Sequence, residues 1–209
     1  MPLPLATQVG PDKDDDWLYL LLLSQMLDKA IYSELRTRQQ LGYIVQCGVT
    51  EAQGVRALVF IVQSSVKTPP ELEARLEAFL RLFRGTLSLI SDEEIATYRD
   101  ALAAEMADVD QRADGQASRL WLECAAQRYD FGRPWRNAKR MRRVTREGVI
   151  AFFDRYVVNG GESRRRLSTH IFAQRVAPKT LRVDSVNEEF WPVPVDGLNK
   201  NWAADRAVV

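Results

Sequence analysis

The sequence predicts an α+β fold in which helices pack on one face of a largely antiparallel sheet. Two apolar strands, at 43–49 and 57–62, are separated by the polar loop 50–54, which ends in Gly54 and is typical of a hairpin. Several segments with a helical period follow, and a further strand is expected only at 164–174. Because helices and strands do not alternate regularly, the order of elements favours an α+β domain over a parallel doubly wound sheet.

The first helix is expected over residues 15–36. An acidic run at 14–16 favours a helix N-terminus through the helix dipole. The apolar residues that recur at helical spacing are Leu20, Leu27, Ile31 and Leu35. In the first strand, one face carries Tyr43, Val45, Cys47 and Val49. The second strand, 57–62, is apolar on both faces and is therefore expected to be covered on both.

Further helices are expected after the hairpin. Thr68-Pro69-Pro70-Glu71 and Ser91-Asp92-Glu93-Glu94 are capping boxes that mark two helix starts, so Glu93 and Glu94 are interpreted as helix-start charges and not as a catalytic pair. The stripe of the first of these helices consists of Leu72, Leu76, Phe79, Phe83, Leu87 and Ile90. A third is expected at about 116–129, with an apolar side of Leu120, Trp121 and Cys124, and a fourth from Thr145 to the stop signal at 159–161.

The length of 209 residues predicts a single domain over 1–175, followed by an extended C-terminal tail over 176–209. The tail has no sustained period and contains several prolines. Phe190 and Trp191 are expected to anchor it on the domain.

Composition favours a cytoplasmic protein that binds neither nucleic acid nor membrane. A formal net charge of +1 provides no global field for polyanions. Cys47 and Cys124 are too few for a disulfide framework and are expected to be buried, inert thiols. The N-terminus lacks the basic start and long apolar run of a signal peptide, and the apolar run 18–23 is too short to span a membrane.

Catalytic chemistry of the usual hydrolytic kinds is absent from the sequence. The chain has one histidine, His170, so it cannot form a zinc site that needs two, and no H-E-x-x-H or H-x-x-E-H motif occurs. A serine triad would need His170 as its base, but this residue lies in a strand-like run and is interpreted as structural. We therefore expect no metal ligand in this chain.

A basic stretch at 133–143 has two interpretations. It contains Trp135 and six basic residues, which would suit an anion or nucleic-acid surface. The simpler interpretation, which we favour, is a solvated linker before the helix at Thr145.

The segment 35–45 reads LRTRQQLGYIV, and it resembles the L-R-x-x-x-Q-L-G-Y-x-V stretch in the C-terminal, fourth domain of insulin-degrading-type zinc peptidases of the insulinase (pitrilysin) family. The segments 60–64 (FIVQS) and 73–79 resemble later parts of the same domain, and the likeness extends over about 14–174. It implies four α+β domains around a closed chamber, with zinc and its H-x-x-E-H motif in the first. It also implies that this chain begins inside the first strand of its domain, so that an edge strand is missing.

The resemblance also implies a role for two residues, Arg36 and Tyr43, which occupy the positions that reach across the chamber to the zinc site. Tyr43 would stabilise the charged oxygen of the transition state, and Arg36 would bind a substrate carbonyl. Gly42 and Gln40 are weaker substrate-binding candidates, Gly42 because it allows an unusual backbone conformation and Gln40 because it could hold the loop. From the residues alone, Tyr43 could instead be a core aromatic and Arg36 could cap the first helix.

These expectations combine into one functional hypothesis: a substrate-binding, chamber-forming domain of a zinc metalloendopeptidase that cleaves oligopeptides. Its zinc would lie in the full-length protein and not in this chain, which would be inactive alone. Its partners would be the N-terminal catalytic half of the same polypeptide, peptide substrates and, for the parent, a second copy in a homodimer. The alternative is a non-catalytic assembly or interaction module of the same fold, as in processing-peptidase core subunits.

Overall fold

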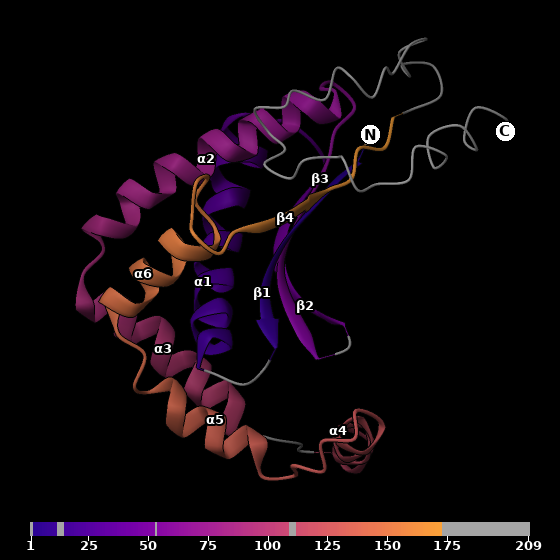
Figure 1. Ribbon diagram of the computed structural model, residues 1–209, viewed down its shortest axis with the longest axis vertical. Helices are drawn as coiled ribbons and strands as arrows, with labels where there is room; N and C mark the ends of the chain where they lie inside the picture. The colour runs from indigo at the N-terminus through magenta and orange to yellow at the C-terminus, as the bar shows by residue number, and fades with distance from the viewer. Residues whose placement is uncertain (1, 12–14, 53, 109–111, 173–209) are drawn as a thin grey trace, which may run out of the picture. The chain divides into compact units, whose positions relative to one another are not determined.

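A four-stranded antiparallel sheet with the order β2-β3-β1-β4 forms the centre of the fold (Figure 1). The computed structural model describes residues 2–11, 15–52, 54–108 and 112–172. The strands are β1 (Pro2–Pro11), β2 (Ile44–Ala52), β3 (Val55–Gln63) and β4 (Arg165–Ser168). Each neighbouring pair runs antiparallel, which confirms the predicted hairpin, the late strand and the type of sheet.

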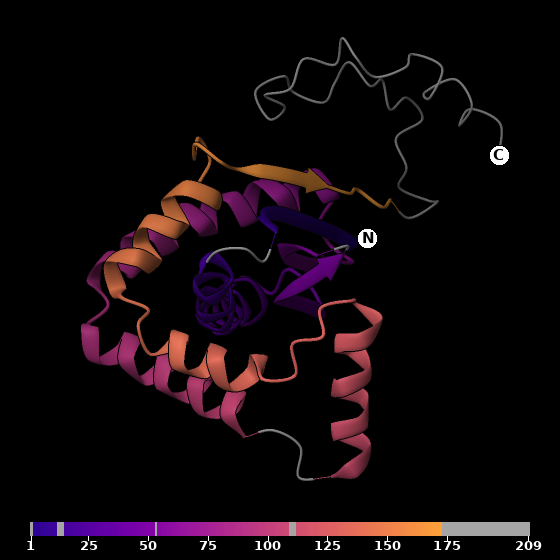
Figure 2. The ribbon, with the colours of Figure 1, turned by 60° about the horizontal axis from the view of Figure 1, so that its bottom comes forward.

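Helices cover one face of this sheet, as predicted, and α1 lies directly against it (Figures 1 and 2). In chain order they are α1 (Asp16–Ile31), the π-helix η1 (Tyr32–Arg38), α2 (Pro69–Leu89), α3 (Asp92–Ala107), α4 (Ala113–Ala125), α5 (Arg133–Met141) and α6 (Arg146–Tyr156). None of the described helices combines the length and apolarity that crossing a bilayer requires. The predicted domain 1–175 and tail 176–209 stay predictions, because residues 173–209 lie outside the described residues.

The core lies between α1 and alternate residues of the strands. Leu3 and Leu5 of β1 and Leu58, Phe60 and Val62 of β3 are fully buried, as their alternation along each strand requires. The helices contribute the stripes that their period predicted, and the fully buried members of α1 include Leu20, Leu27 and Ile31.

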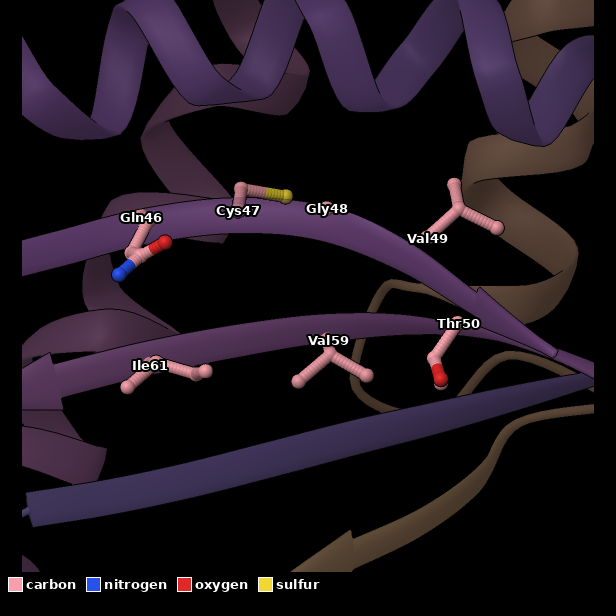
Figure 3. A pocket seen from close by; sticks show the side chains of 7 residues that line it. All are labelled: Gln46, Cys47, Gly48, Val49, Thr50, Val59 and Ile61. Carbon is pink, nitrogen blue, oxygen red and sulfur yellow. The ribbon is translucent and has the colours of Figure 1, made fainter. Parts of the chain in front are cut away.

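Within the described residues the opposite face of β3 is only half-buried, so the expectation that this strand is buried on both faces is wrong there. Ala57, Val59 and Ile61 of β3 are only half-buried. Figure 3 shows a shallow hollow over β2 and β3, in which Val59 and Ile61 point away from α1 whereas Cys47 points toward it. Apolar composition on both faces therefore reflects a partly exposed apolar surface and not a second layer.

Two elements differ from the prediction. The strand β1, which no periodicity predicted, lies inside the sheet between β3 and β4, and the expectation that an edge strand is missing stays a prediction. The segment 133–141 is the helix α5, not a linker, and it buries Ala138 and Met141. The apolar face of α5 is short and lies among basic residues, so the sequence pattern did not reveal it. Arg133, Arg136 and Arg140 pair with carboxylates, and this pairing does not favour an anion surface.

Both capping boxes are confirmed. The backbone N–H of Thr68 donates to the Glu71 carboxylate at 2.9 Å. At the start of α3, Ser91 N donates to Glu94 at 3.2 Å, and Glu94 N donates to the Ser91 hydroxyl at 3.2 Å. Each box satisfies backbone donors that a helix N-terminus leaves without partners, so the starts of α2 and α3 are set locally by the sequence.

A buried ionic cluster holds β4 against α2. Glu77 Oε1 accepts from Arg164 at 2.5 Å and from Arg166 at 2.7 Å. Glu73 pairs with Arg166 at 2.8 Å and contacts Nε2 of His170 at 2.5 Å. His170, two residues after β4, thus joins the end of this strand to α2, in agreement with its structural interpretation.

From the pKa of the Glu73 carboxylate we predict how the free energy of unfolding changes at acid pH. Burial raises its pKa, but the contact with His170, the charge of Arg166 and the Ser168 hydroxyl lower it more, so the net pKa lies below the ordinary value. A depressed carboxylate pKa stabilises the fold above the unfolded pKa of about 4.3, and this contribution is lost as pH falls through the folded value. The free energy of unfolding should therefore decline below about pH 5, and less steeply in Glu73→Gln. Urea unfolding at several pH values measures both slopes, and equal slopes would contradict the assignment.

Candidate functional site

The site residues lie at the junction between α1 and β2, where the first helix changes its winding. The single helix expected over 15–36 is in fact α1 followed by the π-helix η1 (Tyr32–Arg38). The wider turn is closed by Gln39 N, which donates to Glu34 O at 2.9 Å, and by Leu41 N, which donates to Leu35 O at 2.9 Å. Such local π-turns are frequent at functional sites.

Two buried leucines fix the junction. Leu35 is fully buried and Leu41 nearly so, which anchors both ends of the turn in the core. Between them, Gln40 adopts a left-handed conformation with φ of 50°. The Gln40 side chain is exposed. The role that the structure shows for this residue is therefore in the backbone, as the turn that ends the helix.

Gly42 is required by close packing. The prediction assigned it a conformation that other residues resist, but its φ is not among the positive values in this structure. A Cβ at this position would instead overlap the carbonyl oxygen of Gln63 and lie 2.7 Å from its carbonyl carbon. The junction therefore passes against the end of β3 at a distance that only glycine allows, and this contact fixes where the next residue, Tyr43, emerges.

Arg36 and Tyr43 are in direct contact on the surface. Arg36 Nη1 donates to the backbone carbonyl of Tyr43, and its guanidinium carbon lies 5.1 Å from the centre of the Tyr43 ring. The Tyr43 side chain is 79% exposed, so it is not a core aromatic. It precedes the first residue of β2 and does not join the buried side of the strand, to which Val45 belongs. Arg36 is half-buried and bonds beyond the end of its helix, so it is not a helix cap.

Tyr32 is a member of this group that the sequence reasoning missed. Its ring lies 5.0 Å from the Arg36 guanidinium, on which it packs as Tyr43 does, and it is also exposed. Contacts of this kind between a cation and a ring hold the guanidinium plane in place. The signal was present, because residues four apart on a helix are neighbours, and Tyr32 is four residues before Arg36.

A polar network supports the end of η1. Glu34 accepts from Gln39 at 2.8 Å and from Arg38 at 3.1 Å. The hydrogen bond from Gln39, together with Arg38, lowers the pKa of Glu34, which stays ionised at neutral pH. Gln39 in turn accepts from Arg75 of α2 at 3.4 Å, so the network joins the junction to the next helix.

The two thiols and the histidine do not belong to this site. Cys47 lies on the α1 side of β2, its backbone N–H donates to Asp28 at 2.8 Å, and burial raises the pKa of its thiol. Both cysteines are free. Among the residues that the structure describes, no group of three His, Cys, Asp or Glu side chains could hold a metal ion. What the junction offers is a phenol O–H and a guanidinium, both hydrogen-bond donors, on an exposed surface.

Comparison with known proteins shows the class of domain to which this fold and junction correspond, the C-terminal lobe domains of one peptidase family. Residues 22–121 match the family described as PQQ synthase PqqF-like, C-terminal lobe domain 4. The chain is 30% identical over 159 residues to insulin-degrading enzyme of Homo sapiens, a match that covers 76% of the chain and 16% of the enzyme. It is 29% identical over 197 residues to insulin-degrading enzyme of Drosophila melanogaster, which covers 94% of the chain and 19% of the enzyme.

A solved structure agrees with these relatives. The crystal structure of pitrilysin superposes with a TM-score of 0.65 and 25% identity, over 75% of the chain and 17% of pitrilysin. The chain is thus a C-terminal domain of the insulinase-family type. It spans less than a fifth of the length of the insulin-degrading enzymes it matches.

Proposed function

We propose that this chain is the substrate-facing, chamber-forming domain of a zinc metalloendopeptidase that cleaves oligopeptides. The observation that carries the proposal is the exposed Tyr43, in contact with the half-buried Arg36, on the helix–strand junction. A large aromatic side chain that a domain needs only for its own stability is normally buried, whereas Tyr43 is exposed. The similarity to insulin-degrading enzyme and pitrilysin supports peptides as the substrate class.

Tyr43 would act on the oxygen that becomes charged during peptide cleavage. A peptide carbonyl is flat and neutral in the ground state, but its oxygen carries negative charge once the carbon becomes tetrahedral. A phenol O–H aimed at that oxygen binds the transition state more strongly than the substrate, and only such differential binding accelerates the chemical step. Gly42 and Leu41 fix the backbone on its N-terminal side and Arg36 contacts its ring, so the position from which the phenol would act is partly set.

Arg36 would position the peptide. Its guanidinium is planar and carries five N–H donors, of which one is used on the Tyr43 carbonyl. The rings of Tyr32 and Tyr43 hold the plane, so that further N–H groups can meet a substrate carbonyl near the scissile bond. Orientation of this kind reduces the entropic cost of reaching the reactive geometry.

Zinc would be bound by another domain of the full-length protein and would supply an activated water for the attack. The single histidine of this chain is engaged with Glu73, on the contact between β4 and α2. The proposed contribution of this chain to the reaction is therefore the hydrogen-bond donors of Arg36 and Tyr43. For the protein as a whole we propose a cytoplasmic location, an N-terminal catalytic half as the main partner, and a homodimer of the parent.

The test compares the full-length protein with this chain. We expect the full-length protein to bind one zinc ion per catalytic site and to cleave a fluorogenic oligopeptide. We expect the 209-residue chain to bind no stoichiometric zinc and to show no turnover above buffer. Equilibrium dialysis with metal analysis and a fluorescence assay measure both. A full-length protein without zinc or turnover would favour the non-catalytic assembly module instead.

A further inference from the structure

The helix α4 is attached to the domain in a different way from the other helices. Every other described helix buries at least one apolar side chain, whereas the one buried residue of α4 is Glu123. The predicted apolar side of α4 is therefore not buried: Leu120 and Cys124 are half-buried, and Trp121 is 70% exposed. In Figure 2, α4 stands apart from the helices that cover the sheet. Apolar burial, which stabilises the other helices, contributes little to its position.

Contacts between carboxylates and arginines take the place of apolar packing. Glu123 accepts from Arg133, the first residue of α5, at 2.5 Å and from Arg128 at 3.3 Å. Arg128 also donates to Glu51, near the end of β2, at 2.7 Å. The Glu123 side chain is only 4% exposed. One buried carboxylate thus joins α4 to the start of α5 and, through Arg128, to the sheet.

The sheet end of this series of ion pairs is fixed in the core. Glu51 accepts from Arg56 at 3.0 Å, and the buried guanidinium of Arg56 lies 4.3 Å from the centre of the Trp17 ring. On the α4 side, Arg119 donates to the carbonyl of Phe131 at 3.3 Å. That acceptor is neutral and the contact is exposed. Because hydrogen bonds between charged groups are the stronger ones, Glu123 is the contact on which the position of α4 depends most.

The turn after α4 has an unfavourable backbone conformation. Gln127 and Tyr129 are left-handed, with φ of 54° and 53°, a region that residues other than glycine enter at a cost. The backbone carbonyl of Glu123 closes the turn, since it accepts from Arg128 N at 3.0 Å and from Tyr129 N at 3.3 Å. Backbone strain of this kind persists only where the surroundings hold it. Here the ion pairs of Glu123 hold it.

We propose that α4 is a hinged arm, with the turn 126–130 as its hinge and the Glu123 carboxylate as its latch. In the closed arrangement the ion pairs outweigh the strain at Gln127 and Tyr129. Once the carboxylate is neutralised or its pairing is screened, the turn relaxes and α4 moves away from α5. The released helix also frays, because 13 residues without packing, with Gly115 among them, are marginal in water.

Ionic strength is the signal that this latch would sense. Arg128 is 28% exposed and Glu51 31% exposed, so salt reaches this pair, whereas the apolar contacts of the other helices are not weakened by screening. The arm is thus a conformational device that responds to salt separately from the rest of the fold. The inference does not rest on the proposed function, and none of its tests measures turnover.

The first test compares Glu123→Gln with Glu105→Gln in the 209-residue chain. Glu105 is an exposed carboxylate on α3, so its substitution is matched in charge and shape. In Glu123→Gln, amides of 113–125 should exchange with solvent deuterium at least about tenfold faster than in the unchanged chain, and those of 16–31 in α1 should stay within about twofold. Glu105→Gln should change neither set by more than about twofold.

Salt tests the latch without any substitution. Raising NaCl from about 0.05 M to about 1 M shortens the Debye length to about 3 Å. Exchange of 113–125 relative to 16–31 should then rise at least about twofold in the unchanged chain and should not rise further in Glu123→Gln. No rise in the unchanged chain would overturn the proposal. So would faster exchange of 16–31 together with 113–125 in Glu123→Gln, because α4 would then be part of the cooperative core.

A distance measurement tests the movement itself. Spin labels at Ser118→Cys on α4 and Leu82→Cys on α2, both exposed positions, report the separation of the two helices in a Cys124→Ser background. Burial raises the pKa of the Cys47 thiol, so this cysteine reacts slowly with the label. We expect one narrow distance distribution in the unchanged chain and in Glu105→Gln, and a broad one in Glu123→Gln. A narrow distribution in all three would show that α4 stays in place without its latch, and the hinge would be excluded.

Discussion

Replacing Tyr43 with phenylalanine in the full-length peptidase is expected to lower kcat about a hundredfold, with little change in KM. The substitution removes only the phenol O–H, and the ring that packs on Arg36 remains. If the O–H stabilises charge that develops on the substrate oxygen, its loss affects the transition state and not ground-state binding. Steady-state cleavage of a fluorogenic oligopeptide measures both constants.

The control for Tyr43 is Tyr98→Phe. Tyr98 lies on α3, where its ring contacts Lys29, and its substitution also removes one phenol O–H while keeping the ring. We expect its kcat to stay within about twofold of the unchanged protein, as for most surface substitutions away from a site. Full activity in Tyr43→Phe would exclude the phenol from the mechanism and leave the domain with a structural part only.

Gly42→Ala is expected to reduce the free energy of unfolding of this chain by roughly 3 kcal/mol. The added Cβ would overlap the carbonyl oxygen of Gln63, which is backbone and cannot move without displacing the end of β3. The matched control is Gly48→Ala on β2, where a Cβ meets nothing within 4 Å. Urea unfolding monitored by circular dichroism compares the two.

Gly48→Ala should be neutral or slightly stabilising, because alanine reduces the conformational entropy of the unfolded chain. In the full-length protein, Gly42→Ala should also lower kcat, since the residue fixes where Tyr43 emerges. Equal stability of the two alanine variants would show that the junction can shift, and it would remove the packing reason for glycine at position 42.

Much of the fold could be predicted from local sequence. The capping boxes at Thr68 and Ser91 fixed two helix starts because each box satisfies its own helix end, without help from the rest of the chain. The hairpin of β2 and β3 was equally clear from alternation and from the turn at Gly54. In each case the physical cause lies within a few residues.

The missed elements depend on contacts that are distant in sequence. The strand β1 pairs with β3 and β4, so its partners lie about 50 and 160 residues away, and its prolines at 2, 4 and 11 argue against a central strand. The helix α5 buries a face of only a few residues, among basic side chains whose carboxylate partners come from other segments, as Asp15 does for Arg140. Neither β1 nor α5 can be recognised from its own residues, because the contacts that stabilise each of them come from other parts of the chain.

The candidate site, too, was predictable from the sequence only in part. The motif drew attention to Arg36 and Tyr43, and the structure shows that they touch. Their roles in catalysis stay predictions. The Tyr32 ring over the guanidinium was missed although its spacing from Arg36 indicated it. The π-turn and the packing reason for Gly42 could not be predicted, because they follow from how the junction crosses the end of β3.

The hydrogen bond from Cys47 N–H to Asp28 has a consequence for the behaviour of the chain at high concentration. β2 is the outermost strand on its side of the sheet, and rows of unpaired amides on such strands recruit strands from other molecules into fibrils. The Asp28 carboxylate occupies one of these amides in the middle of the row and brings a negative charge to it. An incoming strand would have to displace this charge, so the aspartate guards the domain against fibrillar self-assembly along β2.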